Sequence, residues 1–355
     1  MVVSAAPLMV ARVEPRSIGW LRSPAWDLTF ISLSAILVPL PLALYTQLTS
    51  LGLAADDSGS VVDALVALLI GGPHMYATFT RTLADPQFRT HHRRIVATSL
   101  LIPIGVISIG LSAFPVLLTV FYLWASVHVL HQIAYLVDCY GRRGVRQSSA
   151  FDRGIDYAVV FTSLYPLALY RMVHGTFVIS GVTLPFPDAV RHDWVAWIAF
   201  VVFGAALTLF LARTIREFRR GEQHWPKLLL ITITVSVAFV LPAANRLDMA
   251  FQGFNAWHSF QYLGLSWFAL RLARERRQVT APLIQRLSGP GSGWRFYGAL
   301  VLCTLGAVGL IGILMLLREP LGLTRQQPYY FTVLSFLLVH YYHDHVLFRR
   351  PEALT

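Results

Sequence analysis

The sequence is poor in charge: only 13% of its 355 residues are Asp, Glu, Lys or Arg, against roughly 25% in a soluble protein. It also holds only two cysteines, Cys139 and Cys303, which fall in or beside different apolar runs. Neither a disulfide framework nor a thiolate metal site is therefore expected. Lysine occurs once, at Lys227, a composition that suggests a bacterial source and says nothing about chemistry.

Hydrophobic sequence is what the chain has in abundance. It is 55% hydrophobic and repeatedly runs apolar for about 20 residues, the length that crosses a bilayer as a helix. We predict an all-α, polytopic transmembrane helix bundle: one domain over 26–350, between an N-terminal segment 1–25 and a tail 351–355. Within that N-terminal segment, the apolar run at 5–11 is too short for a signal-peptide core. The spans are expected near 28–50, 61–80, 95–112, 115–138, 154–173, 194–212, 227–245, 250–270, 296–317 and 329–348.

The positive charges indicate how these ten spans face. If the N-terminus is cytoplasmic and the spans alternate, all but five of the 29 Lys and Arg residues fall on the cytoplasmic side. This asymmetry is typical of membrane topology, so the net charge of +11 predicts orientation and not nucleic-acid binding. Both termini are expected in the cytoplasm, in a bacterial inner membrane. The five exceptions are Arg171, Arg191, Arg246, Arg318 and Arg325.

Histidines gather toward the predicted cytoplasmic leaflet. Ionisable groups at membrane depth are costly unless they meet a partner, a cavity or a metal, and imidazoles suit iron, copper and zinc. The loop residues His91 and His92 are weaker candidates, because they lie among arginines. The residues expected to form a metal site are His74, His128, His131, His258, His340, His343 and His345.

Polar neighbours of these histidines are expected to orient their ring nitrogens. Each has an alternative role, because polar side chains within spans also hydrogen-bond between helices. The residues predicted for this supporting shell are Gln132, Asp138, Asn255, Gln261, Tyr262 and Asp344.

Three functions are compatible with such a cluster. The first is a non-haem iron enzyme, with one or two ions, that performs oxygen chemistry on a hydrophobic or lipid substrate entering from the membrane lipids, with electrons from a cytoplasmic donor. Copper is an alternative metal. The second is a haem protein, which needs one histidine on each of two helices. The third is a transporter that uses the histidines as a proton relay.

Four short patches resemble the Brp/Blh family of membrane-bound β-carotene 15,15′-dioxygenases. They are Gly71-Gly-Pro-His74, the inner histidine His128, His258-Ser259 with Trp267, and His340 with Phe348-Arg349. The resemblance implies that His74, His128, His258 and His340 are iron ligands and that the substrate is carotenoid-like. Tyr262 stands where that family has a second histidine, and His345 where it has an aspartate. More broadly, the histidine content is similar to that of membrane fatty-acid desaturases and hydroxylases.

Overall fold

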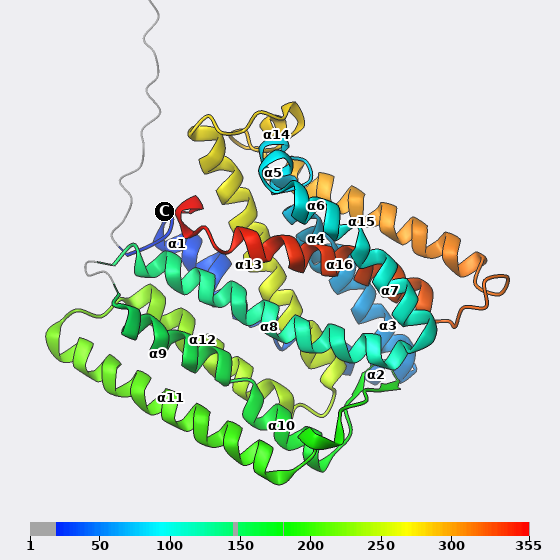
Figure 1. Cartoon of the computed structure of the whole chain (residues 1–355), viewed down its shortest axis with the longest axis horizontal. Coiled ribbons are helices and arrows are strands. Elements are labelled where there is room, and N and C mark those ends of the chain that lie inside the picture. The colour runs from blue at the N-terminus through cyan, green and yellow to red at the C-terminus, as the bar shows by residue number, and fades with distance from the viewer. Residues whose placement is uncertain (1–18, 145–147, 180, 355) are drawn as a thin grey trace, which may run out of the picture.

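The computed structural model describes residues 19–144, 148–179 and 181–354. The first 18 residues of the predicted N-terminal segment, which include Arg12 and Arg16, lie outside the described residues, as do Arg146 and Thr355. Within the described part, helices follow one another almost without interruption and the strands amount to one short hairpin (Figure 1). The predicted all-α class is confirmed.

The helices are as follows. The first half contains α1 (Pro24–Asp27), the π-helix η1 (Leu28–Ser32), the 3-10 helix η2 (Leu33–Leu37), α2 (Leu40–Ser50), α3 (Ala55–Val66), the π-helix η3 (Ala67–Gly71), α4 (Gly72–Arg81), α5 (Pro86–His91), α6 (Arg93–Ser99), α7 (Leu101–Ser112), α8 (Phe114–Gly141), α9 (Ala150–Thr162) and α10 (Tyr165–His174). The second half contains η4 (Asp188–Val190), α11 (Asp193–Arg220), α12 (Trp225–Val240), η5 (Leu241–Ala243), α13 (Leu247–Glu275), α14 (Pro282–Leu287), α15 (Gly293–Leu316), α16 (Gln327–Leu347) and η6 (Pro351–Ala353). Between the halves, β1 (Val178–Ile179) pairs antiparallel with β2 (Val182–Thr183).

Seven helical stretches are long and apolar enough to cross a membrane, which supports a multi-pass membrane protein. They are Pro24–Ser50, Ala55–Arg81, Arg93–Ser112, Phe114–Gly141, Asp193–Arg220, Trp225–Ala243 and Gly293–Leu316. The other three predicted spans also fall on helices: α9 with α10, α13 and α16. The first of these is interrupted between Thr162 and Tyr165, and α16 carries three histidines and an aspartate. By length and apolar composition, the described helices therefore include seven candidate membrane spans, three fewer than the sequence predicts.

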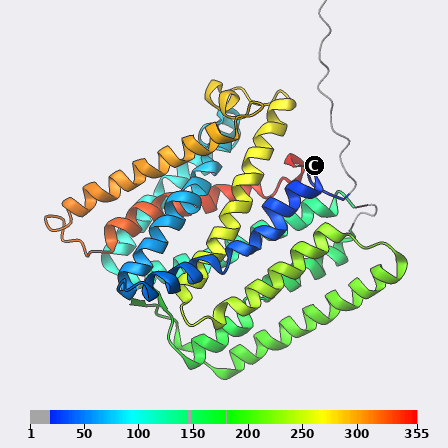
Figure 2. The same cartoon turned by 180° about the vertical axis from the view of Figure 1, so that it is seen from behind.

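The helices lie side by side, with α11 along one edge of the bundle and α15 along the opposite edge (Figures 1 and 2). Both edge helices expose large apolar side chains, such as Trp197 at 68% and Leu302 at 69%, as lipid-facing helices do. Between the edges, α4, α13, α8 and α16 form a closed ring in which each helix packs against the next. This ring positions the candidate site.

Close backbone approaches hold the ring helices to their neighbours. A Cβ on Gly253 of α13 would lie 1.9 Å from the carbonyl oxygen of Val38, at the end of η2. A Cβ on Gly72, at the start of α4, would lie 2.4 Å from Thr304 of α15. Only glycine allows these contacts, because real Cβ atoms do not approach other atoms so closely.

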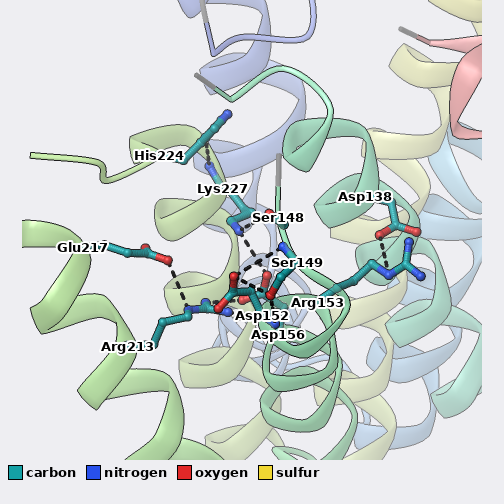
Figure 3. A network of polar contacts seen from close by, with 10 residues as sticks. All are labelled: Asp138, Ser148, Ser149, Asp152, Arg153, Asp156, Arg213, Glu217, His224 and Lys227. Carbon is teal, nitrogen blue, oxygen red and sulfur yellow. Dashed lines mark hydrogen bonds and ion pairs between the residues drawn. The ribbon is translucent and has the colours of Figure 1, made fainter. Parts of the chain in front are cut away.

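Away from the ring, α9, α11 and α12 are joined by a buried ionic network (Figure 3). The carboxylate of Asp156 on α9 accepts hydrogen bonds from Arg213 on α11 and from Lys227 Nζ on α12, the latter at 3.1 Å. Arg213 also lies 3.3 Å from Glu217. The carboxylates of Asp156 and Glu217 balance the positive charges of Arg213 and Lys227, which allows the charged groups to be buried together.

Candidate metal centre

Four imidazole rings, one from each helix of the central ring, meet at one point in the interior. Successive ring centroids lie 5.2 Å apart from His74 to His258, 5.1 Å from His258 to His128, 5.0 Å from His128 to His340, and 4.7 Å from His340 back to His74. All four rings are at least 96% buried. We call these four residues the histidine quartet.

The nitrogen atoms of the quartet are close enough to share a metal ion. One ring nitrogen each of His74, His258 and His340 lie within 4.8 Å of one another. The same holds for ring nitrogens of His128 and His340 together with a carboxylate oxygen of Asp344. Both groups contain His340, so they form one continuous cluster of five potential ligands.

Hydrogen bonds fix which nitrogen of His74 faces the cluster. Its Nδ1 lies 2.6 Å from the carbonyl oxygen of Gly71 and 2.9 Å from Ser259 Oγ. A carbonyl only accepts, so Nδ1 carries the proton and Nε2 keeps a bare lone pair. Nε2 has no hydrogen-bond partner among the described residues, although it is fully buried. A metal-ligating histidine typically has this arrangement.

His340 is oriented in the same way by side chains. Its Nδ1 lies 2.5 Å from Thr78 Oγ1, whose own proton goes to Asp344 Oδ1 at 2.8 Å. Thr78 therefore accepts from His340, which leaves His340 Nε2 as the bare nitrogen. Tyr262 also donates to Asp344 Oδ1, at 2.5 Å. The second oxygen, Oδ2, has no hydrogen-bond partner among the residues that the structure describes, and it lies 3.5 Å from His340 Nδ1 and 3.8 Å from His128 Nε2.

The other two rings of the quartet are also unpaired. His128 Nε2 and both ring nitrogens of His258 have no hydrogen-bond partner in the described part of the chain. Buried polar atoms without partners are rare and costly. Four adjacent imidazoles with unpaired nitrogens, beside a carboxylate with an unpaired oxygen, fit the coordination of a metal ion.

The Gly-Gly-Pro sequence before His74 explains how α4 presents this residue. Proline has no N–H, so Pro73 cannot satisfy the Leu69 carbonyl oxygen four residues earlier; Tyr297 of α15 donates to that oxygen at 2.6 Å. The π-helix η3 lies directly before this point, and such π-turns occur frequently at functional sites. The irregular helical geometry before α4 is therefore associated with the Gly71-Gly72-Pro73 motif that directly precedes His74.

Most of the predicted supporting residues lie around the quartet. Gln132 Nε2 donates to the His258 carbonyl oxygen at 3.2 Å and to Gln261 Oε1 at 3.1 Å, and Gln261 donates to Ile31. Asn255 supports His74 indirectly, through Ser259: its Oδ1 accepts from Ser259 Oγ at 3.2 Å, and Ser259 contacts His74. These amides fix α13 and α8 relative to one another.

Three predicted ligands lie outside the quartet. His131 and His345 face each other with ring centroids 5.7 Å apart, and Arg349 contacts His345 Nε2 at 2.6 Å. His343 is buried, but its Nδ1 contacts Thr82 Oγ1 at 3.1 Å, and it belongs to neither group of potential ligands. The loop candidate His92 instead contacts Arg350 at 3.4 Å. Histidines three to five residues from a quartet member on the same helix thus point elsewhere.

Asp138 requires a correction. The sequence predicts it beside the metal site, but its carboxylate accepts from Tyr157 at 2.6 Å and lies 3.9 Å from Arg153 (Figure 3). Asp138 follows His128 by ten residues, which on a helix is about 15 Å. The side chain is therefore too far along α8 to reach the quartet.

Sequence reasoning misses Thr78, which joins His340, Tyr262 and Asp344. A signal for it exists: Thr78 follows His74 by four residues and so shares its face of α4.

A cavity of about 130 Å³ adjoins the quartet, and its mostly apolar wall includes His74 and Tyr341 together with the polar side chains of Asp63, Asp248, Gln252 and Asn255. The Tyr341 ring stacks on His128, with centroids 3.9 Å apart. Aromatic side chains from α8, α13 and α16 form much of the remaining wall, and β1 adds Ile179. The aromatic residues are Phe121, Tyr122, Phe251, Tyr329 and Tyr330. The cluster is thus open to an apolar ligand on one side.

No protein-family model, curated protein or solved structure matches this chain. The function is therefore argued from the site alone.

Proposed function

We propose that this protein is an integral membrane metalloenzyme, a non-haem iron and oxygen-dependent oxidoreductase acting on a lipid, isoprenoid or carotenoid. The observation that carries the proposal is the meeting of four buried imidazoles from four helices, each of which has an Nε2 atom without a hydrogen-bond partner among the described residues. Imidazole nitrogens with one carboxylate suit iron, and the fully buried position protects oxygen chemistry from water.

The chain's own residues would hold and orient the metal. His74, His128, His258 and His340 would be its ligands, and Asp344 Oδ2 would supply a negative charge beside it. Thr78, Ser259 and the Gly71 carbonyl would keep the Nδ1 protons in place so that Nε2 faces the ion. Bound iron would supply the oxygen chemistry.

The apolar cavity supports a hydrophobic substrate. Its wall contains His74, so a chain lying in it would place a carbon atom beside the quartet. Its aromatic lining favours a flat, conjugated or isoprenoid chain over a polar molecule. A substrate of this kind would enter from the membrane lipids.

The proposed topology is ten spans with both termini in the cytoplasm of a bacterial inner membrane. It is supported by the helices found at all ten predicted positions and by the arginine asymmetry. Two of the three remaining spans, α13 and α16, carry quartet residues, and the third is divided between α9 and α10. A membrane enzyme is expected to place its polar groups inside the bundle in this way.

The geometry disfavours a haem. The two axial histidines of a haem lie on opposite faces of a wide macrocycle. In the quartet each ring has two further rings within about 5 Å, and these occupy the space in which a porphyrin would lie.

The test is metal analysis and an absorption spectrum on full-length protein purified in a mild detergent. Wild type should contain iron without a Soret band, and alanine variants at His74, His128, His258 and His340 should each lose it. The matched controls are His131→Ala and His345→Ala, which remove neighbouring histidines on α8 and α16 and should retain wild-type iron.

Other outcomes would redirect the assignment. A Soret band would move it to a haem protein. Zinc or copper held by the same four residues would keep the metal centre and change its chemistry. Protein that neither contains nor takes up any metal would leave the histidines as a proton relay, which flux in proteoliposomes would then examine.

A further inference from the structure

A second cavity, of about 450 Å³, lies at the opposite side of the quartet from the apolar one. Its wall comes from the ends of α4 and α13, from α5 and α14, and from the residues that follow α16. Figure 1 shows α5 and α14 together at the end of the bundle where α13 finishes. The volume is within the range of small-ligand sites.

Three arginines line this cavity, and none of them forms an ion pair with a carboxylate within the described ranges. They are Arg81 at the end of α4, Arg276 directly after α13, and Arg350 after α16. Within the described ranges, Arg276 contacts only the backbone carbonyl of Glu352, at 3.1 Å, and Arg350 contacts His92 Nε2, at 3.4 Å. Arg81 forms no ion pair in the same part of the chain, but its positive charge is close enough to interact electrostatically with Asp344 of the metal centre.

Some arginines elsewhere in the described part of the chain do form ion pairs. Arg142, Arg213, Arg246 and Arg271 each pair with a carboxylate, at Glu352, Asp156, Asp248 and Glu275 respectively. The one acidic residue of the cavity, Asp85, instead caps α5 by accepting from the Gln87 N–H at 2.9 Å. The cavity is therefore strongly positive, and burial together with the nearby Arg350 and His91 lowers the pKa of His92.

The cavity contacts the helices that carry the quartet. Arg81 lies one turn beyond Thr78 on α4, and Leu347 of the cavity wall lies one turn beyond His343 on α16. The Phe88 ring of the cavity wall packs between two histidines, 5.8 Å from the His343 ring and 4.7 Å from His92. An occupant would fix the ends of α4, α13 and α16 relative to one another.

We propose that this cavity binds a phosphate group, held by Arg81, Arg276 and Arg350, independently of the metal. Guanidinium groups match phosphate oxygens in geometry and charge. The phosphate could belong to a soluble compound or to a phospholipid headgroup, since basic pockets between membrane helices bind both. Binding would relieve the repulsion among three cations and clamp the helix ends over the metal centre.

The experiment uses full-length protein in an uncharged detergent, titrated with inorganic phosphate and followed by thermal unfolding. Sodium chloride at equal ionic strength controls for screening, because a specific site saturates and general salt stabilisation does not. We expect saturable stabilisation by phosphate. Affinity should fall about tenfold or more in Arg276→Gln and again in Arg350→Gln, as expected for the loss of charge-assisted bonds.

Arg271→Gln is the matched control, because Arg271 lies on α13 between the cavity residues Leu270 and Ala273, is not itself part of the cavity wall, and pairs with Glu275. It should bind phosphate like wild type. Stabilisation that never saturates, or that falls equally in the control, would overturn the proposal. Native mass spectrometry then identifies the source: an anionic phospholipid that co-purifies with wild type, is displaced by phosphate and is absent from the variants indicates a headgroup. Phosphate binding without retained lipid indicates a soluble ligand.

Discussion

Thr78 Oγ1 on α4 lies 2.5 Å from His340 Nδ1 on α16 and 2.8 Å from Asp344 Oδ1, one turn further along the same helix. A single hydroxyl thus joins two residues of the candidate metal centre and the two helices that carry them. Because it accepts from the imidazole and donates to the carboxylate, it determines the tautomer of His340. Its role is positioning, since no ligand atom for the metal comes from Thr78 itself.

Replacing Thr78 with valine should weaken metal binding about 10- to 100-fold, the usual effect of losing a hydrogen bond behind a histidine ligand. Valine has the same shape but cannot accept from Nδ1, so His340 would lose its fixed tautomer. The measurement is metal affinity from competition with a chelator of known strength. Thr78→Ser keeps the hydroxyl and should bind nearly as wild type does.

The control for this prediction is Thr234→Val. Thr234 on α12 is buried, but its hydroxyl bonds only the Leu230 carbonyl of its own helix, at 2.8 Å. Its loss should leave metal affinity unchanged. If Thr78→Val also retained wild-type affinity, the bond to His340 would be structural only.

Asp344→Asn should have opposite effects on the metal-free and metal-loaded protein. The amide keeps an oxygen for the donors Thr78 and Tyr262 but removes a buried charge whose second oxygen has no hydrogen bond. An unpaired buried charge destabilises the metal-free protein, so the thermal midpoint of that form should stay or rise. Affinity for a divalent ion should fall at least about tenfold. A parallel fall in both would show that Asp344 serves the fold and not the metal.

The sequence predicts the location of the helices well, because apolar runs of bilayer length leave few alternatives. It also predicts a histidine cluster, and of the predicted residues the structure brings His74, His128, His258 and His340 together. Helical spacing alone cannot separate these from His131 and His343. Residues three apart differ by only about 60° around a helix, and in a close-packed bundle this angle decides whether a ring faces the centre or another helix.

Thr78 is hard to identify from the sequence for a related reason. Threonines within apolar helices commonly bond a carbonyl of their own helix, as Thr82 does with the Thr78 carbonyl at 3.0 Å. Only the approach of α16 shows that the Thr78 hydroxyl is used between helices. The contact depends on packing, which the sequence of one segment does not contain.

Gly253→Ala should destabilise the protein by about 1–3 kcal/mol, the usual range for overpacking. The added Cβ would lie 1.9 Å from the Val38 carbonyl oxygen, and a backbone atom cannot move aside as a side chain can. Because Gly253 precedes His258 by five residues on α13, metal content should fall as well. Thermal unfolding and metal analysis measure the two effects. Gly204→Ala on the edge helix α11 is the control: no atom lies within 4 Å of its added Cβ, so stability should hold or rise slightly.

Asp156→Asn should be among the most destabilising changes outside the metal centre, at about 3–5 kcal/mol, because it leaves two buried cations without their shared anion. The side chains of Asp156, Arg213 and Lys227 are 1%, 4% and 9% exposed. Adding Lys227→Met to this variant should recover part of the loss, since Arg213 retains Glu217 at 3.3 Å and no unpaired ammonium remains.

An exposed ion pair gives the comparison for Asp156. Arg142 and Glu352 lie 2.9 Å apart with side chains 46% and 62% exposed, so Glu352→Gln should change stability by about 1 kcal/mol or less. Metal content should be unchanged in Asp156→Asn, in Asp156→Asn with Lys227→Met, and in Glu352→Gln, because none of the helices that carry these residues carries a quartet residue. Metal loss in Asp156→Asn protein that is still folded would instead show that this network and the metal centre are coupled through α8, against which α9 and α12 pack.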